Sequence, residues 1–538
     1  MGGLSFQRGV FETFLTSLDE HPNRPFLRYV EGETSEASWT YTDVAAQVAE
    51  LQNQYSGAAY RPGDRVAVAA QRSIDIYFHL LALNGLGLSL VPVDLKASDA
   101  EIAYLLNHSD SRMVVSQRDQ AQRLRAVAGS TGCRVATPDE LSECATGPTE
   151  IVMGDAGREA ALLYTSGTTG KPKGCILSNE YFLAVGRWYN ELGGYCKLES
   201  GDWLLTPLPP THMNALCVSF MAMMMSGGCV VQLDRFHPST WWHTVRTEEA
   251  NIVHYLGVMP AILLSLPVSD NESFASRVRF GFGAGVDPRH HERFERRFGF
   301  PLLEAWAMTE TGGGAAVIAN REPRHVGRRC FGRPPSEIEY RLVNDEDHDV
   351  SDGEPGELLV RRRGDQPRLG FFSGYHRDEV ATEEVWRGGW FHTGDVVRAG
   401  TDGSLYFVDR RKNVIRRSGE NISAVEVEMT LMEHDDVTNC AVTAVPDDLR
   451  GDEVFALIMP KPGVLANEQT AEALFEYCME RLSYFKVPAY IAWVEGLPLT
   501  ASQKVSRKEL KNTARCLLED ARCFDYRERK KPRERKAG

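Results

Sequence analysis

A short run of hydroxyl, glycine and lysine residues at positions 165–174 carries the residue types that bind phosphate. The run reads Thr-Ser-Gly-Thr-Thr-Gly-Lys-Pro-Lys-Gly, and it follows an apolar stretch, residues 161–164, that is typical of a buried strand. Glycine lets backbone N–H groups close around an anion, hydroxyl groups donate to phosphate oxygens, and lysine adds positive charge. The spacing differs from a Walker A loop, because two residues separate Gly167 from Gly170 and Pro172 follows Lys171. We therefore predict a different kind of triphosphate-binding loop, and not a merely flexible polar segment.

Residues 164–174 resemble the phosphate-loop signature of the adenylate-forming (ANL) superfamily, which comprises acyl-CoA synthetases, peptide-synthetase adenylation domains and firefly-type luciferases. The resemblance continues in order from about residue 10 to about residue 510. Within the superfamily the chain is most similar to acyl-CoA ligases of the carnitine/crotonobetaine type, chiefly through Asp-Arg-Arg-Lys-Asn-Val-Ile-Arg-Arg-Ser-Gly-Glu-Asn-Ile-Ser at 409–423. It implies an enzyme that uses ATP, Mg²⁺ and coenzyme A to convert a small carboxylic acid into its CoA thioester.

The resemblance assigns the residues that would bind the nucleotide phosphates and magnesium. Residues 305–310, Ala-Trp-Ala-Met-Thr-Glu, are similar to the magnesium motif, in which Glu310 would bind Mg²⁺ and Thr309 would contact phosphate. Carboxylate oxygens are the ligands that this hard cation prefers. Trp306 stands where the family usually has a tyrosine that stacks on adenine. The implied phosphate-loop contacts are Thr165, Ser166, Gly167, Thr168, Thr169, Gly170 and Lys173.

Two further motifs would bind the ribose and the adenine. Residues 390–395, Trp-Phe-His-Thr-Gly-Asp, resemble the family's Thr-Gly-Asp motif, and the carboxylate of Asp395 can accept two ribose hydroxyl hydrogens. Arg410 matches a second ribose contact of the family. The resemblance also places a glycine-rich segment against adenine and the acyl group, namely Gly283, Ala284 and Gly285.

The remaining implied residues serve the acid, the reaction and coenzyme A. His212 matches a residue that gates the acyl pocket, and Gly419 matches a glycine that leaves room for the pantetheine arm. Lys504 closes a run, Leu-Pro-Leu-Thr-Ala-Ser-Gln-Lys, that resembles the family's catalytic lysine motif, although Gln503 replaces the usual glycine. Lys412 occupies the family's hinge position between two domains that rotate between the half-reactions.

The pattern of apolar runs predicts an α/β fold. Strands near residues 65–70, 90–93 and 113–115 alternate with helices, which indicates a parallel sheet covered by helices. Pro92 would place its strand at a sheet edge or a strand start. We expect a large N-terminal domain, residues 1–409, with a β-rich subdomain over about 340–408. A smaller, mobile C-terminal α+β domain would follow over 410–515.

The last stretch is strongly basic, because residues 527–536 hold seven basic and two acidic side chains. We expect 516–538 to be a disordered, solvated tail. Residues 213–233 are uncharged and long enough to cross a bilayer, but the glycines at 227 and 228 favour a buried helix followed by a strand.

Composition narrows the class of partner and compartment. The chain has 538 residues and a formal net charge of −14, which argues against nucleic acid as a partner. Its eleven cysteines form no C-x-x-C, and its N-terminus lacks an apolar signal, so we expect a reduced, cytoplasmic protein without a membrane span. Residues 345–349 begin like a calcium loop but lack its glycine and final glutamate. The sequence leaves the oligomeric state open.

The leading hypothesis is an AMP-forming acid–CoA ligase for a small polar or betaine-type acid. Trp306 offers an aromatic face that attracts a quaternary ammonium, although it could equally be a core residue. The alternatives are a ligase for a short aliphatic or aromatic acid, a freestanding adenylation enzyme that loads a carrier protein, a luciferase-like oxygenase, and a non-catalytic nucleotide-binding regulator. Turnover with ATP, CoA and a panel of acids would separate them.

Overall fold

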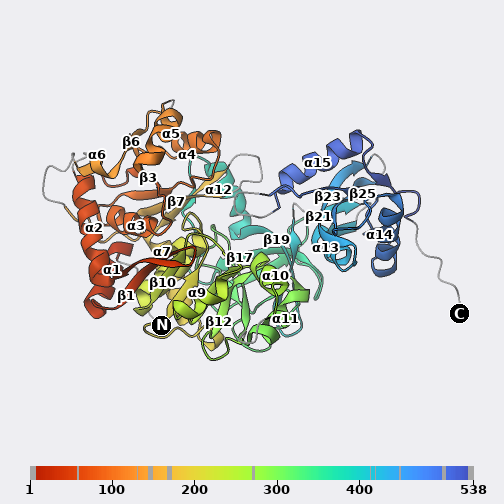
Figure 1. The fold of residues 1–538 in the computed structure, drawn as a ribbon, viewed down its shortest axis with the longest axis horizontal. Helices are drawn as coiled ribbons and strands as arrows, with labels where there is room; N and C mark the ends of the chain where they lie inside the picture. Colours follow the sequence, from red (N-terminus) through yellow and green to blue (C-terminus); the bar gives the residue numbers. More distant parts are fainter. Residues whose placement is uncertain are drawn as a thin grey trace. The chain divides into compact units, whose positions relative to one another are not determined.

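The computed structural model describes residues 8–56, 60–129, 131–142, 150–165, 172–268, 273–411, 414–417, 420–447, 450–499 and 505–530. Figure 1 shows the chain, which divides into two compact units. The large unit consists of Met1–Arg341, Leu359–His392 and Gly400–Tyr406. The small unit consists of Leu342–Leu358, Thr393–Ala399 and Phe407–Gly538. The expected α/β class is confirmed, while the domain boundary at 409–410 stays a prediction.

The large unit contains an eight-stranded sheet that is parallel from β13 to β1. An antiparallel strand lies at each edge, β2 beside β1 and β14 beside β13. Strand β10 lies on one side of β9 and β11 on the other, so the strand order reverses there. In spatial order the strands are β14 (Val317–Ile318), β13 (Leu302–Trp306), β12 (Phe280–Ala284), β11 (Ile252–Leu256), β9 (Trp203–Thr206), β10 (Cys229–Leu233), β1 (Pro25–Glu31) and β2 (Thr34–Thr40).

A seven-stranded sheet of the large unit carries the ends of the predicted phosphate loop. Its strands β7 and β8 are antiparallel neighbours, and β4, β3, β5 and β6 are parallel. In spatial order the strands are β18 (Gly374–Tyr375), β8 (Lys173–Ser178), β7 (Glu159–Thr165), β4 (Ser89–Pro92), β3 (Arg65–Ala69), β5 (Met113–Ser116) and β6 (Arg134–Ala136).

Two further sheets account for the remaining strands. The five-stranded sheet has the order β15 (Cys330–Gly332), β20 (Leu405–Arg410), β19 (Phe391–Ala399), β17 (Gly356–Arg362) and β16 (Ile338–Val343). The six-stranded sheet of the small unit has the order β22 (Glu420–Ser423), β21 (Val414–Arg417), β24 (Gly451–Pro460), β25 (Tyr490–Trp493) and β26 (Phe524–Asp525), with β23 (Val437–Asp447) also paired to β24.

Helices cover these sheets, as the strand–helix alternation predicts. The α-helices are α1 (Val10–Glu20), α2 (Tyr41–Ser56), α3 (Asp75–Gly85), α4 (Asp99–His108), α5 (Arg118–Ala128), α6 (Pro138–Ser142), α7 (Asn179–Glu191), α8 (Phe220–Ser226), α9 (Trp241–Thr247), α10 (Val258–Ser265), α11 (Pro288–Phe298), α12 (Glu379–Val385), α13 (Ala424–Met432), α14 (Glu468–Arg481) and α15 (Arg507–Glu519). Shorter turns are the 3-10 segments Gly194–Cys196 and Arg387–Gly389 and a π-helix, η2 (Asn214–Ser219). None of the helices in the described ranges is long and apolar enough to cross a bilayer.

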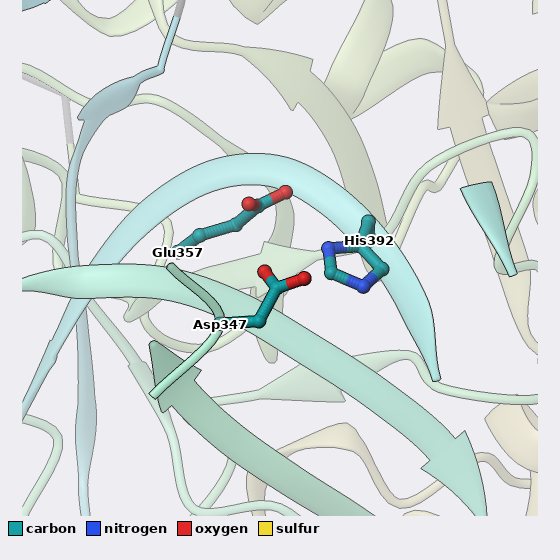
Figure 2. Close-up of side chains that lie close together, drawn as sticks. All are labelled: Asp347, Glu357 and His392. Carbon is teal, nitrogen blue, oxygen red and sulfur yellow. The ribbon is translucent and has the colours of Figure 1, made fainter. Parts of the chain in front are cut away.

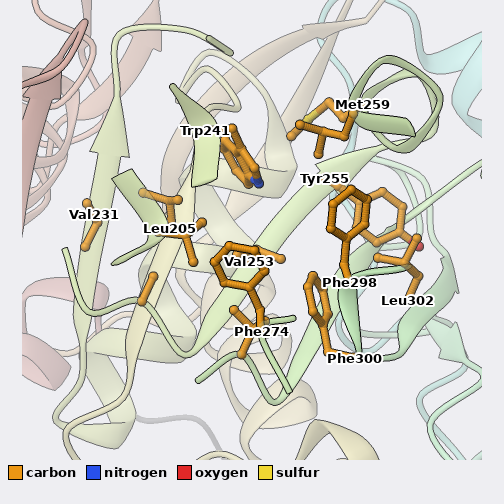
Figure 3. Close-up of a cluster of buried hydrophobic side chains, with 14 of the residues drawn as sticks. Leu205, Val231, Trp241, Val253, Tyr255, Met259, Phe274, Phe298, Phe300 and Leu302 are labelled. Atoms are coloured by element: carbon orange, nitrogen blue, oxygen red, sulfur yellow. The ribbon is translucent and has the colours of Figure 1, made fainter. Parts of the chain in front are cut away.

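The core of the large unit shows why the eight-stranded sheet holds together. Trp241 and Met259 come from α9 and α10, and Phe298 comes from α11. Their side chains pack on one face of β11 and its neighbours, beside Val253 and Tyr255 (Figure 3). Val253 and Tyr255 lie on the same face of β11 because they are two positions apart, and successive side chains of a strand point to opposite faces.

Strand β24 in the small unit is covered on both faces. Val454, Ala456 and Ile458 pack with the apolar faces of α13 and α14. The alternate residues Phe455 and Leu457 pack with α15. Figure 1 shows α15 on one side of this sheet and α13 and α14 on the other. The continuous apolar run over 454–459 is therefore a strand buried on both sides.

Most expected elements are confirmed near their expected bounds. A capping box opens α4, because Ser98 Oγ accepts the Glu101 N–H and the Glu101 carboxylate accepts the Ser98 N–H at 2.8 Å. The predicted strands at 65–70 and 113–115 are β3 and β5. The ten cysteines in the described residues are free thiols.

The position of Pro92 corrects one expectation. Strand β4 lies between β7 and β3 inside the seven-stranded sheet, not at an edge. The strand tolerates the missing N–H because Pro92 is its last residue, and the next ladder bond is made by Val93, whose N–H donates to Val68 O at 2.9 Å.

The C-terminal stretch corrects a second expectation, that residues 516–538 form a disordered, solvated tail. Residues up to Glu519 continue α15, and Phe524–Asp525 form β26 beside β25. Burial of Tyr526 and Lys530 shows that 516–530 pack against the small unit and are not a solvated tail. The prediction for 531–538 falls outside the described residues.

The uncharged run at 213–233 forms η2, α8 and β10, so the predicted buried helix and strand are confirmed. The helix ends at Gly227, whose φ of +69° suits glycine, and a Cβ there would lie 2.2 Å from His21 Cδ2. Gly32 has a similar φ of +60° with nothing within 4 Å of its Cβ position.

We predict that Gly227→Ala destabilises the large unit more than Gly32→Ala does. Both variants carry the cost of about 1–2 kcal/mol for a left-handed non-glycine residue. Gly227→Ala adds an overpacking cost of about 1–3 kcal/mol against His21. Denaturant unfolding followed by tryptophan fluorescence measures both. Adding His21→Ala should remove the difference, and equal stability of the two single variants would contradict the steric explanation.

Candidate active site

The predicted phosphate loop joins two antiparallel strands. Thr165 at the end of β7 pairs with Lys173 at the start of β8. Residues 166–171 between them lie outside the described part of the chain, so the predictions for Ser166, Gly167, Thr168, Thr169 and Gly170 are not examined by the structure. The two described ends fix where the loop leaves and re-enters the sheet.

Lys173 lies in a polar and aromatic environment built by the segment after β18. Its Nζ is 3.4 Å from Asp378 Oδ2 and 4.5 Å from the ring centroid of Tyr375. Tyr375 is within reach because β18 pairs with β8 and aligns Tyr375 with Cys175. The ring and the carboxylate together hold the ammonium group at the end of the phosphate loop.

The same tyrosine binds the predicted magnesium ligand. The Tyr375 hydroxyl donates to Glu310 Oε1 at 2.9 Å, and Glu310 is only 7% exposed. Burial raises the pKa of Tyr375, and the neighbouring Glu310 raises it further, so the hydroxyl keeps the proton that it donates. Tyr375 therefore connects Glu310 with Lys173, which brings two predicted site residues together.

Backbone contacts hold the rest of the predicted magnesium motif. The Tyr181 hydroxyl donates to Thr309 O at 2.8 Å, and the Phe372 N–H donates to Glu310 O at 3.0 Å. These bonds use the two carbonyl oxygens and hold the backbone of the motif, while the Glu310 carboxylate accepts the Tyr375 hydroxyl. A single buried carboxylate next to a phosphate loop fits Mg²⁺, which is commonly bound by one or two carboxylates together with substrate phosphates.

The predicted glycine segment ends strand β12. Gly285 has a φ of +80°, and a Cβ on Gly283 would lie 2.3 Å from Tyr255 O, so both positions require glycine. The carboxylate of Glu304 accepts the N–H groups of Gly285 at 2.9 Å and Val286 at 3.0 Å. Burial raises the pKa of Glu304.

Ala284 and Gly285 are exposed at the carboxyl end of β12. The structure therefore presents this segment to solvent, as a ligand-contacting segment requires, and supports it from beneath by Glu304. The carboxylate of Glu304 also accepts the Tyr255 hydroxyl at 3.1 Å.

His212, Gly285 and Thr309 each follow the carboxyl end of a parallel strand, namely β9, β12 and β13. Ligands of open α/β sheets bind at that edge, near the point where the strand order reverses. The His212 side chain is exposed. Trp306 is 6% exposed and its ring stacks on Phe331 at 5.8 Å, so one face of the indole is already covered.

The predicted ribose residues meet in the small unit. Arg410 Nε lies 2.6 Å from Asp395 Oδ1, and the Asp395 side chain is nearly fully buried. The turn before Asp395 is held by Glu357, whose Oε1 accepts the Gly394 N–H at 3.1 Å, and by Thr393, whose hydroxyl donates to Leu358 O at 2.7 Å. Lys412, Gly419, Gln503 and Lys504 lie outside the described residues.

Figure 2 shows Asp347, Glu357 and His392, whose possible ligand atoms all lie within 4.8 Å of one another. Glu357 already accepts the Gly394 N–H, and its other oxygen forms an ion pair with Arg411. A carboxylate neutralised by a guanidinium is a poor cation ligand, so we assign Glu357 to holding the turn before Asp395 and not to a metal.

Sequence reasoning missed Tyr375, Asp378, Glu304 and Glu357. Each acts on a residue far away in the chain, such as Tyr375 on Glu310, 65 positions apart. Periodicity and local motifs carry no signal for such pairs. Glu304 carries the one local signal, because it is an acidic residue inside the otherwise apolar strand Leu302–Trp306. A buried carboxylate needs hydrogen-bond partners, so this position indicates a structural or functional role.

Comparisons with known proteins place this geometry in a family. The family model described as AMP-binding enzyme matches residues 14–376, and the model of the AMP-binding enzyme C-terminal domain matches residues 426–504. The chain is 30% identical to a sulfoacetate–CoA ligase of Cupriavidus necator over 92% of this chain and 95% of the relative. It is 27% identical to a crotonobetaine/carnitine–CoA ligase of Proteus mirabilis over 88% and 93%.

A solved structure agrees with these relatives. The O-succinylbenzoate coenzyme A synthetase of Bacillus subtilis, in complex with ATP and magnesium ion, superposes with a TM-score of 0.80 at 27% identity, covering 94% of this chain and 99% of the other. The chain therefore belongs to the AMP-binding enzyme family, and the two sequence relatives named above are CoA ligases.

Proposed function

We propose that the chain is an ATP-dependent, AMP-forming acid–CoA ligase. In the first half-reaction a carboxylate oxygen attacks the α-phosphorus of ATP, which yields acyl-AMP and releases pyrophosphate. In the second, the sulfur of CoA attacks the acyl carbonyl, the bond to AMP breaks, and the thiol proton passes to solvent. The observation that carries the proposal is the Lys173–Tyr375–Glu310 arrangement, which joins the end of a phosphate loop to a buried carboxylate.

The residues divide the work of adenylation. The 165–174 loop would cradle the phosphates, while Asp395 and Arg410 would bind the ribose. Mg²⁺, held by Glu310, would neutralise phosphate charge when bound. Lys504 would supply positive charge where carboxylate and α-phosphate meet, because that is where negative charge concentrates in the transition state. Lys412 would act as the hinge and Gly419 would admit the pantetheine arm in the second step.

A buried polar cluster behind His212 favours a polar acid as the substrate. His254 Nδ1 contacts Ser219 Oγ at 2.9 Å and Asn214 Oδ1 at 3.1 Å, and its Nε2 contacts the Tyr189 hydroxyl at 3.1 Å. Burial lowers the pKa of His254 to about 3, so the imidazole is neutral. Burial raises the pKa of Tyr189, so its hydroxyl keeps a proton that can donate to Nε2; the Nδ1–H is then shared as one bond between Ser219 Oγ and Asn214 Oδ1.

This bond turns the amide nitrogen of Asn214 away from His254. Asn214 is partly exposed, lies two residues after His212, and follows strand β9 at the edge where ligands of such sheets bind. Its amide could therefore donate to a polar acid, in keeping with the sulfoacetate and carnitine relatives. The alternatives remain a short aliphatic or aromatic acid, a freestanding adenylation enzyme loading a carrier protein, an oxygenase, or a regulator without turnover. We also propose a cytoplasmic location.

The reaction class is tested by products and by Glu310. Incubation with ATP, CoA and a panel of acids should give AMP, pyrophosphate and a thioester, whereas stoichiometric ADP would refute the assignment. Glu310→Gln should lower magnesium-dependent adenylation by roughly 100-fold or more. Tyr375→Phe, which keeps the carboxylate but removes its donor, should cost roughly 10-fold. Pyrophosphate exchange measures both, and similar losses would mean that Tyr375 does more than orient Glu310.

Lys504→Ala should separate the two half-reactions. We expect adenylation to fall by roughly 100- to 1,000-fold, because the charge is needed in that transition state. Thioester formation from supplied acyl-AMP should stay near the wild-type rate. Gln503→Gly serves as the matched variant and should leave adenylation unchanged or improve it. Equal loss in both half-reactions would show that Lys504 supports the fold and not the chemistry.

Asn214→Leu should change the acid preference without changing ATP binding. The specificity constant kcat/KM for polar acids such as sulfoacetate should fall roughly 10-fold, since a polar contact is lost. The value for apolar acids of similar size should hold or rise. The KM for ATP is the internal control. A uniform loss for all acids would place Asn214 outside the acid site.

A further inference from the structure

The turn after strand β12 is a short exposed stretch held between buried residues. Ala284 and Gly285 are exposed at the carboxyl end of β12, whereas Gly283 before them is buried. Val286 after them is also buried, in the same core cluster as Tyr255, which Figure 3 labels. Only two residues of the turn therefore face solvent, and the chain is anchored immediately on either side of them.

Glu304 holds this turn from the side of its N–H groups. Strand β13 runs parallel to β12 and aligns Glu304 with Gly283, so the side chain reaches forward past the end of β12. One carboxylate oxygen accepts the Gly285 N–H at 2.9 Å. The other oxygen accepts the Val286 N–H at 3.0 Å and the Tyr255 hydroxyl at 3.1 Å. These three donors are all neutral groups.

An acid at this buried position has a physical reason. Glu304 is only 6% exposed, and burial raises the pKa of its carboxyl group. A glutamine would avoid much of that cost, because a neutral amide is cheaper to bury than a carboxylate. An amide, however, offers one acceptor and one donor, whereas a carboxylate accepts at both oxygens. Of the two side chains, only the acid can satisfy two adjacent N–H groups through two separate oxygens.

Gly257 confines the same turn from the side of its carbonyl oxygen. Gly257 follows strand β11, which lies beside β12 in the sheet. A Cβ on Gly257 would lie 1.8 Å from Gly285 O, so no larger residue fits there unless that peptide group moves. Gly285 is thus bounded by a carboxylate at its N–H and by the backbone of Gly257 at its carbonyl oxygen.

These contacts restrict the exposed turn to one position. The carboxylate, the close backbone contact and the buried side chain of Val286 restrain different atoms of the same short stretch. Binding groups that are held by strands and by supporting hydrogen bonds place a ligand more precisely than groups on an unsupported loop. The turn belongs to the segment that we assign to adenine and the acyl group, so the role inferred for its supports rests on the proposed function.

We propose that Glu304 is a positioning residue for binding of the nucleotide and the acid. It acts without touching either of them. Through the N–H groups of Gly285 and Val286 it holds the turn against the backbone of Gly257, in the arrangement that receives both ligands. The Tyr255 hydroxyl donates to the same carboxylate but does not belong to the turn, so its bond contributes to stability and not to positioning.

The test measures calorimetric binding of AMP to the full chain. Glu304→Gln keeps the shape of the side chain but turns an amide donor toward one of the two N–H groups. We therefore expect the Kd for AMP to rise roughly 10-fold. In adenylation the KM for ATP and for the acid should rise while kcat changes little, because binding is lost and not chemistry. Tyr255→Phe is the matched control: it keeps both bonds to the turn and should bind AMP as wild type does.

A comparison of stability separates positioning from a purely structural role. Each of the two variants removes a buried hydrogen bond from the same carboxylate, so denaturant unfolding should show similar losses of stability for both. Only Glu304→Gln should weaken AMP binding. If that variant does not fold, Gly257→Ala takes its place, because its Cβ displaces the same peptide group while the carboxylate stays intact.

Two results would overturn the inference. One is an AMP affinity that is unchanged in whichever of Glu304→Gln and Gly257→Ala folds. The other is equal weakening by that variant and by Tyr255→Phe, which would make the carboxylate a support of the fold alone. If the wild-type protein itself binds no AMP, the proposed function fails instead.

Discussion

A carboxylate withdrawn from water must be given partners, and this requirement organises the structure around its candidate site. An isolated buried charge is expensive, so each buried acid fixes the elements that supply its donors. Glu310 accepts a hydrogen bond from the Tyr375 hydroxyl, and Glu304 accepts the N–H groups of the turn after β12. Asp395 forms an ion pair with Arg410. In every case the acid and its partner come from different strands or loops. The positions of the implied nucleotide contacts are therefore consequences of burying negative charge.

The same requirement explains what the sequence could and could not predict. Local patterns specify local structure, so the capping box at Ser98 and the strand β24 are predictable from neighbouring residues alone. The pairing of Asp395 with Arg410 was also accessible, because both carry recognisable motifs. The Tyr375–Glu310 bond was not, because register between distant strands decides it, and no property of Tyr375 itself marks it as a partner of Glu310.

The two wrong expectations have the same origin. The expectation for Pro92 rested on the N–H that proline lacks. Because Pro92 is the last residue of β4, the missing N–H breaks no necessary ladder bond, and the strand can lie inside the sheet. The expectation of a disordered tail that included residues 516–530 rested on their charge, which is a property of composition and not of the fold. Burial of Tyr526 against Phe475, and of Lys530 against Glu453, depends on a surface that only the folded small unit offers. Tertiary context overrode both local rules.

Neutrality of His254 constrains how an acid could be selected. An imidazole with its pKa lowered to about 3 carries no charge at physiological pH, so it cannot attract an anionic substituent. Its contribution is directional, because its two nitrogens join Tyr189 on one side to Ser219 and Asn214 on the other. A site built to donate a hydrogen bond rejects an analogue without an acceptor far more strongly than an apolar pocket rejects a missing methylene. If the proposed polar-acid site is correct, His254 would contribute to selectivity by orienting the Asn214 amide and not by its own charge.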